Sequence, residues 1–279
     1  GGYGGASLNK IVSHMWITTE GAFGIAVGVS ASMVFLFVLF GALLERAGAG
    51  NYFIRVAYAL TGHYRGGPAK AAVVSSAMTG MISGSSIANV VTTGTFTIPL
   101  MKRVGFPSEK AGAIEVASST NGQLTPPIMG TAAFLMVEYV GVSYIEVIKH
   151  AFLPAVISYI ALIYIVHLEA LKSGMEGLKR TNKLNKVDRL IGISSVLIVL
   201  GALVWVLPPF FEFIKTIAGE ATTLLVALIM VFSYLGLLYS VSRMPDLPSG
   251  EIIEIPEIGK TVKAGLHFLL PVILLIWLL

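Results

Sequence analysis

The chain has 279 residues, of which 55% are hydrophobic and only 12% are charged, and its mean hydropathy is +0.83. Soluble domains carry about 25% charged residues, so the composition excludes an ordinary soluble enzyme, a disordered region and a nucleic-acid-binding module. The net charge is +4, and with no cysteine the chain offers no disulfide, thiol catalyst or Cys-ligated metal. We expect an all-α, polytopic protein embedded in a lipid bilayer, with no nucleic-acid partner.

Five apolar runs are long enough, or nearly so, for a helix that crosses the roughly 30 Å hydrocarbon core of a bilayer. They cover residues 24–44, 151–166, 190–207, 221–241 and, up to the end of the chain, 264–279. A short amphipathic helix is expected at the cytoplasmic interface over residues 51–67. The chain starts at Gly1 without an initiator Met and stops inside an apolar run, so we expect both ends to lie within a longer protein.

Two further stretches do not fit simple membrane-spanning helices. Residues 68–100 are too long for one ordinary span and are interrupted by Ser83-Gly84-Ser85-Ser86. Residues 108–140 contain Pro126 and Pro127, which remove two backbone donors and disfavour a continuous helix. We therefore predict a hairpin over 68–100 and a broken helix over 108–140.

The basic residues predict that the hairpin enters and leaves the membrane on the same side. Loops on both sides of residues 68–100 are basic, which conflicts with the positive-inside rule if this stretch crosses the bilayer. With a re-entrant hairpin, sixteen of the 19 basic residues are cytoplasmic, and three are outside: Lys10, Lys149 and Lys215.

Oxygen-bearing side chains gather at the two breaks. Ser83, Ser85, Ser86 and Asn89 lie at the first, and Ser119, Thr120, Asn121, Gln123 and Thr125 lie at the second. Irregular backbone at membrane depth is tolerated where it is buried or lines a watery cavity, and unwound carbonyls there coordinate hard cations. Single small residues more often serve helix packing. Two polar clusters that both coincide with a break favour a cation site, and Gly84 and Gly122 permit close backbone approach.

Three segments together resemble the large, DctM-type membrane subunit of TRAP transporters: Gly80–Val90, Thr93–Arg103 and Ala117–Gly130. Thr19–Gly24 and Phe37–Ala42 resemble the version, often associated with TAXI-type binding proteins, in which the small and large subunits are fused. The resemblance covers most of residues 19–167.

The resemblance implies the first half of an inverted-repeat, elevator-type secondary transporter in the cytoplasmic (inner) membrane of a bacterium or archaeon. Residues 21–170 would be the first repeat, preceded by an extracytoplasmic segment (1–20) and followed by a cytoplasmic loop (171–189) and the start of the second repeat (190–279). Such a transporter takes up a small carboxylate delivered by a periplasmic binding protein, and it works with a fused or separate small membrane subunit. It needs no covalent cofactor, and Na⁺ is the coupling ion.

By motif, the resemblance assigns Ser85, Asn89 and Gly122 as sodium ligands. Less defined roles fall to neighbouring positions: Ser83, Ser86, Asn121, Gln123, Thr125 and Pro126. Glu115 is a further candidate for a role in transport, because an intramembrane carboxylate is often functional. It is equally consistent with a carboxylate near the interface that snorkels or pairs with Lys110 or Arg103.

Two other classes of protein are weighed against the transporter. Re-entrant loops also build the selectivity filters of ion channels and occur in other sodium-coupled transporters. A membrane-embedded hydrolase with Ser85 or Ser86 as nucleophile is disfavoured, because neither serine lies in a Gly-x-Ser-x-Gly elbow. An ATP-driven pump is excluded because the P-loop-like Gly259-Lys260-Thr261 has Glu254 where the first glycine is needed. We therefore do not expect an enzyme.

Overall fold

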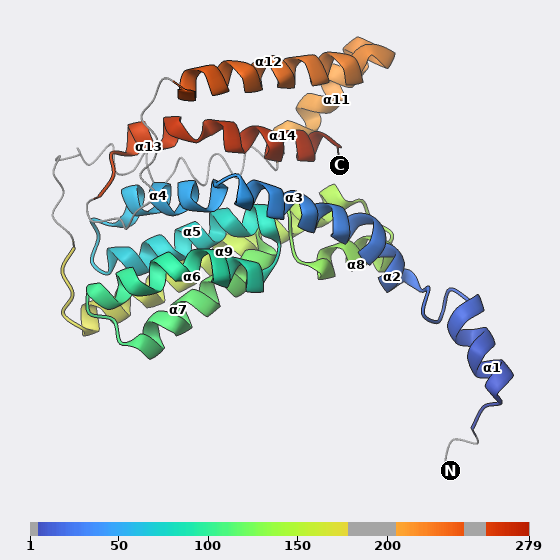
Figure 1. Ribbon diagram of the computed structural model, residues 1–279, viewed down its shortest axis with the longest axis horizontal. Coiled ribbons are helices and arrows are strands. Elements are labelled where there is room, and N and C mark those ends of the chain that lie inside the picture. Colours follow the sequence, from blue (N-terminus) through green and yellow to red (C-terminus); the bar gives the residue numbers. More distant parts are fainter. Residues whose placement is uncertain (1–4, 178–204, 243–254, 279) are drawn as a thin grey trace.

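The computed structural model describes residues 5–177, 205–242 and 255–278, which form helices and no β-strand (Figure 1). The helices are α1 (Leu8–Val12), α2 (Ile25–Val29), α3 (Phe35–Arg46), α4 (Ala49–Thr61), α5 (Gly67–Ser83), α6 (Ser86–Arg103), α7 (Ser108–Asn121), α8 (Thr131–Val140), α9 (Tyr144–Lys172), α11 (Leu207–Ala218), α12 (Thr222–Ser242), α13 (Ile258–Ala264) and α14 (Leu269–Leu278). The all-α class is confirmed for these residues. Most of the expected span at 190–207 and of the expected loop at 171–189 lies outside them.

Among the described residues, two continuous helices are long and apolar enough, by length and composition, to cross a membrane. One runs from Ile25 to Arg46 through α2, a short π-helical segment and α3, and the other is α9, with 29 residues. Helix α9 starts well before the expected residue 151, because Ser143 Oγ caps it by accepting from the backbone N–H of Glu146 at 3.3 Å. Glu146 and Lys149 consequently lie in the first turns of α9, before the expected start of this span.

Helix α4 occupies the position of the expected amphipathic helix, but it is enclosed by other helices, and its location at the cytoplasmic interface stays a prediction. Nearly all of its side chains are buried against neighbouring helices, including Arg55 at 5% exposure. Arg55 Nε donates to Asn51 Oδ1, one turn earlier, at 3.2 Å. Polar side chains on this helix therefore hydrogen-bond to each other within the helix. Tyr52 Oη donates to the carbonyl of Val262 at 3.0 Å, which ties α4 to α13.

Helices α5 and α6 form a hairpin with a very short connection. Helix α5 ends at Gly84, whose φ of +57° is the left-handed conformation that favours glycine. Ser85 is the N-cap of α6, because its Oγ accepts from the backbone N–H of Ala88 at 3.3 Å. The two helices pack side by side over the range expected for the hairpin (Figure 1). That this hairpin re-enters the membrane from one side stays a prediction, as do the repeat boundaries.

The following segment is interrupted where two prolines stand together. Helix α7 ends at Asn121, and a single 3₁₀ turn covers Gly122–Leu124. The chain then runs without helix through Pro126 and Pro127 until α8 begins at Thr131. Neither proline can donate a backbone hydrogen bond, which gives the break a local cause.

Helix α5 lies at the centre of this region and contacts α4, α6, α7 and α9. A core cluster of Val73, Met101, Phe106 and Val166 joins α5, the end of α6 and α9. Helices α12 and α14 lie on the other side of α3 and α4 (Figure 1). The central position of α5 brings the hairpin and the broken segment together.

Candidate functional site

The two breaks in the chain meet in space. The backbone N–H of Ile128, in the broken segment, donates to the carbonyl of Met81 at the end of α5, at 3.3 Å. A Cβ atom placed on Gly84 would lie only 2.6 Å from the carbonyl oxygen of Met129. The end of the hairpin is therefore in direct backbone contact with the non-helical stretch.

A second close approach joins the last turn of α5 to the 3₁₀ turn. A Cβ on Gly80 would lie 2.5 Å from the Cα of Gly122, which is too close for any side chain. Glycine at both positions allows the two backbones to touch. The turn at Gly122 is consequently held against α5 without a side chain in between.

Asn89, in the first turns of α6, lies between these contacts and is fully buried. Its Nδ2 donates to the carbonyl oxygen of Ser76 at 2.9 Å. A Cβ on Gly122 would lie 2.7 Å from the same nitrogen, so Asn89 and Gly122 are immediate neighbours. Because a carbonyl oxygen can only accept a hydrogen bond, the NH₂ end of the Asn89 side chain must face Ser76. Its Oδ1 then points to the other side and remains an acceptor. Oδ1 has no hydrogen-bond partner among the described residues.

Two other buried oxygens of the hairpin also lack partners in the described part of the chain: Thr79 Oγ1 and Ser83 Oγ. They lie four residues apart on α5 and so share a face of that helix. Buried polar atoms in folded proteins nearly always have a partner, so this group of oxygens indicates unused binding capacity. Ser75, by contrast, is equally buried on α5 and donates to the carbonyl of Ala72 at 3.1 Å.

Side chains of the two predicted clusters also bond to each other. Gln123 Nε2 donates to Ser86 Oγ at 2.7 Å and so links the broken segment to the start of α6. Ser85 is half-buried and its Oγ is used as the cap of α6. These three predicted residues therefore lie at the junction of the breaks.

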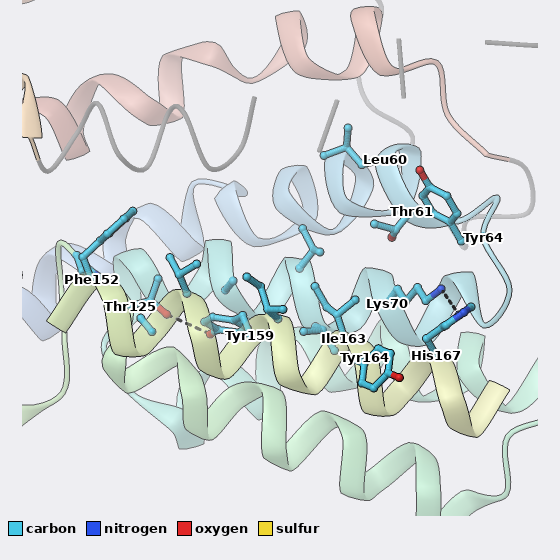
Figure 2. A pocket seen from close by; sticks show the side chains of 17 residues that line it. Leu60, Thr61, Tyr64, Lys70, Thr125, Phe152, Tyr159, Ile163, Tyr164 and His167 are labelled. Carbon is cyan, nitrogen blue, oxygen red and sulfur yellow. Dashed lines mark hydrogen bonds between the residues drawn. The ribbon is translucent and has the colours of Figure 1, made fainter. Parts of the chain in front are cut away.

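Thr125, Pro126 and Asn121 are placed differently. Thr125 Oγ1 lies 3.1 Å from the hydroxyl of Tyr159 on α9 and 3.3 Å from the carbonyl of Asn121 (Figure 2). The Thr125 hydroxyl therefore hydrogen-bonds to α9 and to its own preceding turn. Pro126 and Thr125 also line an apolar cavity of about 510 Å³ between α4, α5 and α9.

At another part of this cavity Lys70 Nζ lies 3.0 Å from His167 Nδ1, which therefore accepts the hydrogen bond (Figure 2). The cavity walls are otherwise almost wholly aliphatic and aromatic. No group of three His, Cys, Asp or Glu side chains within the described ranges could hold a metal ion.

Glu115, on α7, is fully buried and surrounded by hydroxyl groups. Thr93 Oγ1 donates to its Oε1, Thr97 Oγ1 to its Oε2 at 2.5 Å, and Ser119 Oγ to its Oε1 at 3.3 Å. Ser76 Oγ lies 3.4 Å from the hydroxyls of both Thr93 and Ser119. The carboxyl group is thus enclosed by side chains of α5, α6 and α7.

The interpretation of Glu115 as an interfacial ion-pair partner is wrong. Lys110 instead pairs with Glu169 on α9. No lysine or arginine nitrogen of the described residues lies within 4.0 Å of the Glu115 carboxylate. Lys110 is five residues from Glu115, which places the two on different faces of α7.

Sequence reasoning missed Ser76, Thr79 and Tyr159. Ser76, Thr79, Gly80 and Ser83 recur at intervals of three, one and three residues along α5, which places them along one side of the helix. This pattern would have identified the face of α5 that contacts Asn89 and Gly122. Tyr159 had no such signal, because it is one aromatic residue within a long apolar helix.

Comparison with known proteins decides the family. Residues 3–240 match the family described as the tripartite ATP-independent periplasmic transporter, DctM component. The chain belongs to this DctM family. The family is one of transporter components rather than enzymes, in agreement with the sequence-based expectation.

Individual relatives are similar over about a third of the chain. The C4-dicarboxylate TRAP transporter large permease protein DctM of Rhodobacter capsulatus is 36% identical over 91 residues, 33% of this chain and 21% of that protein. The ectoine TRAP transporter large permease protein TeaC of Halomonas elongata is 32% identical over 95 residues, 34% of this chain and 22% of that protein. The sialic acid TRAP transporter permease protein SiaT of Haemophilus influenzae is 31% identical over 91 residues, 33% of this chain and 15% of that protein. The matched parts thus span less than a quarter of each of these relatives.

Proposed function

We propose that this DctM-family chain is part of the membrane permease of a TRAP system. The permease would take up a small organic anion, driven by a sodium gradient. The permease would lie in the cytoplasmic membrane of a bacterium or archaeon. It would work with a periplasmic binding protein and a fused or separate small membrane subunit. The family match and the two long apolar helices support the membrane role.

The single observation that carries the sodium assignment is the junction of the two breaks around Asn89. Asn89 Oδ1 and Ser83 Oγ are buried acceptors without partners in the described residues, and Gly122 brings an irregular turn into contact with Asn89. Neutral side-chain and carbonyl oxygens at broken helices are the ligands that transporters use for Na⁺. The donor set of the junction therefore fits this ion.

Roles for individual residues follow from their positions. Asn89 and Ser83 would supply side-chain oxygens, and Gly122 would supply backbone oxygen, together with Ser85. Gln123 and Ser86 would hold the two breaks together through their mutual hydrogen bond. The Thr125 hydroxyl would not bind the ion, because it hydrogen-bonds to Tyr159 and so holds the broken segment against α9.

The substrate class is proposed by analogy with relatives whose names specify C4-dicarboxylates, ectoine and sialic acid. Each of these compounds carries at least one carboxylate. We propose a small carboxylate as substrate on that ground.

The test is uptake by the full-length permease in proteoliposomes, with its binding protein outside. A panel of radiolabelled carboxylates, beginning with succinate, serves as the probe. We expect uptake only with an inward sodium gradient, and its loss in Asn89→Ala and Ser85→Ala. Ser75→Ala is the matched control and should retain uptake, because the Ser75 hydroxyl donates to the carbonyl of Ala72 in its own helix.

Unchanged sodium dependence in both site variants would refute the sodium assignment. A flux that needs neither sodium nor the binding protein would favour the channel, the second candidate.

A further inference from the structure

Glu115 is a buried carboxyl group that the proposed sodium site does not use. It is fully buried, and the described residues that donate hydrogen bonds to it do so through hydroxyl groups: Thr93, Thr97 and Ser119. An ionised carboxylate with no counter-charge is costly at membrane depth. The surroundings of Glu115 within the described residues therefore supply hydrogen bonds but no positive charge.

Charged groups on α7 and on the helices packed against it either contact residues other than Glu115 or lie more than one helical turn away from its hydrogen-bond donors. Lys70 on α5 contacts His167 on α9, and Lys110 pairs with Glu169. Lys102 and Arg103 end α6, more than one turn beyond Thr97. None of the ion pairs among the described residues includes the Glu115 carboxylate, so a proton or an added cation would balance its charge within this part of the chain.

The packing around Glu115 has space for a proton but not for a second metal ion. Thr97 Oγ1 is 2.5 Å from Oε2, and Ser119 Oγ is 3.3 Å from Oε1. A cation of the size of Ca²⁺, close to that of Na⁺, sits about 2.3–2.6 Å from each of its oxygens and must separate them. The hydroxyl and carboxylate oxygens around Glu115 are already at hydrogen-bond distance from each other, which leaves no room for such an ion between them.

The same hydroxyls can serve either protonation state of Glu115. Thr93 Oγ1 also lies 2.7 Å from the carbonyl of Asn89, and Thr97 Oγ1 lies 2.9 Å from the carbonyl of Thr93. Each hydroxyl has one hydrogen, which it donates either to the carboxylate or to the carbonyl one turn earlier. A neutral Glu115 can in turn donate its own proton to a hydroxyl oxygen. Both states are thus satisfied without moving a helix.

This cluster is connected to the proposed sodium site through Ser76 and α6. The Ser76 carbonyl accepts from Asn89, while its hydroxyl lies 3.4 Å from those of Thr93 and Ser119. Thr93 is four residues after Asn89 on α6, a rise of about 6 Å. A positive ion at Asn89 therefore acts on Glu115 over a short, weakly screened distance and favours its ionised form.

We propose that Glu115 is a proton-binding site that exchanges with sodium: it holds a proton while the site at Asn89 is empty and releases it to solution when Na⁺ binds. The exchange is balanced, since Glu115–COOH and Na⁺ give Glu115–COO⁻, bound Na⁺ and H⁺. The proposal rests on the proposed sodium function. It predicts that sodium and protons compete, so that sodium binds more tightly as the pH rises.

The experiment uses the full-length permease in detergent, with NaCl added as the probe against choline chloride. Infrared difference spectra report the C=O stretch of a protonated carboxyl, and calorimetry gives the sodium affinity at several pH values. Variants are Glu115→Gln, which removes the proton site, and Glu115→Asp, which keeps it. Glu169→Gln is the control, because Glu169 is a carboxylate of the same helical bundle that is paired with Lys110. Thermal unfolding establishes that each variant is folded.

In the wild-type protein and in Glu169→Gln, we expect sodium to remove a protonated-carboxyl band. In both, sodium affinity should fall by up to about tenfold per unit decrease in pH. Glu115→Gln should lack the band and bind sodium independently of pH, and Glu115→Asp should restore both signals.

The same pH dependence in Glu115→Gln as in wild type would overturn the proposal. Sodium binding that leaves the carboxyl band unchanged would refute the exchange alone. A wild-type protein that binds no sodium at any pH would refute the proposed sodium function as well.

Discussion

The amide nitrogen of Asn89 donates a 2.9 Å hydrogen bond to the carbonyl oxygen of Ser76 and so fastens one arm of the α5–α6 hairpin to the other. This bond fixes the orientation of the Asn89 side chain, because the carbonyl can accept only from the NH₂ group. Asn89 Oδ1 is left buried without a partner among the described residues. The hairpin therefore presents a preoriented oxygen beside the turn at Gly122.

The first prediction concerns the contact between Gly122 and Asn89. Gly122→Ala would place a Cβ 2.7 Å from Asn89 Nδ2 and 3.2 Å from the Cα of Gly80. We expect a loss of about 1–3 kcal/mol in stability, as for other overpacked sites, and loss of sodium-driven uptake. Thermal unfolding and proteoliposome uptake measure the two effects.

Gly112→Ala is the matched control for this prediction, since it lies on the neighbouring helix α7 with no atom within 4 Å of its added Cβ. Alanine in a helix interior should leave stability unchanged or raise it by up to about 1 kcal/mol. Equal losses of stability and of uptake in the two variants would contradict the close approach at Gly122.

A second prediction separates backbone strain from the meeting of the breaks. Gly84 and Gly141 both have positive φ, at +57° and +73°. A Cβ on Gly84 would also meet the carbonyl of Met129 at 2.6 Å, whereas a Cβ on Gly141 meets nothing within 4 Å. Gly141→Ala should therefore cost only the strain of about 1–2 kcal/mol.

Gly84→Ala should cost clearly more and should abolish uptake, because the hairpin end must move away from Met129. Unfolding temperatures of the two variants, compared side by side in the full-length protein, make the measurement. If the two variants lose the same stability and both retain uptake, the contact between the breaks is not required.

The third prediction concerns the hydrogen bond that turns Thr125 toward α9. Tyr159→Phe removes the hydroxyl that lies 3.1 Å from Thr125 Oγ1 and should cost about 0.5–1.5 kcal/mol. Sodium affinity should change little, because the Thr125 hydroxyl is not among the proposed ligands. Tyr164→Phe, in the same cavity wall but 60% exposed, should change neither quantity. A large loss of sodium affinity in Tyr159→Phe alone would make Thr125 part of the site.

The breaks themselves could be predicted from sequence because their causes are local. Gly84 followed by Ser85 combines a left-handed helix end with an N-cap, and the pair Pro126-Pro127 cannot continue a helix. The all-α class likewise follows from composition and from the length of the apolar runs. The DctM resemblance rested on these same segments and was confirmed by the family match. Its further implication, a fused permease of the TAXI-associated kind, stays a prediction.

The contacts between the breaks could not be predicted, because they depend on how separate helices rotate toward each other. No local rule pairs Asn89 with Ser76, or Gly80 with Gly122. The partners of Glu115 show the same limit, since Thr93 and Thr97 come from α6. The burial of α4 also depends on α5 and α13, and an amphipathic pattern alone does not distinguish a membrane surface from a protein interior.

The most direct test of the central claim is a sodium-binding isotherm of the full-length permease, measured by calorimetry in detergent without substrate. We expect saturable sodium binding in the wild type and in Ser75→Ala. The affinity should be at least about tenfold lower in Asn89→Ala and Ser83→Ala, a loss of about 1.4 kcal/mol or more in binding free energy. Wild-type affinity in both site variants, with each shown to be folded, would contradict a cation site at the junction of the two breaks.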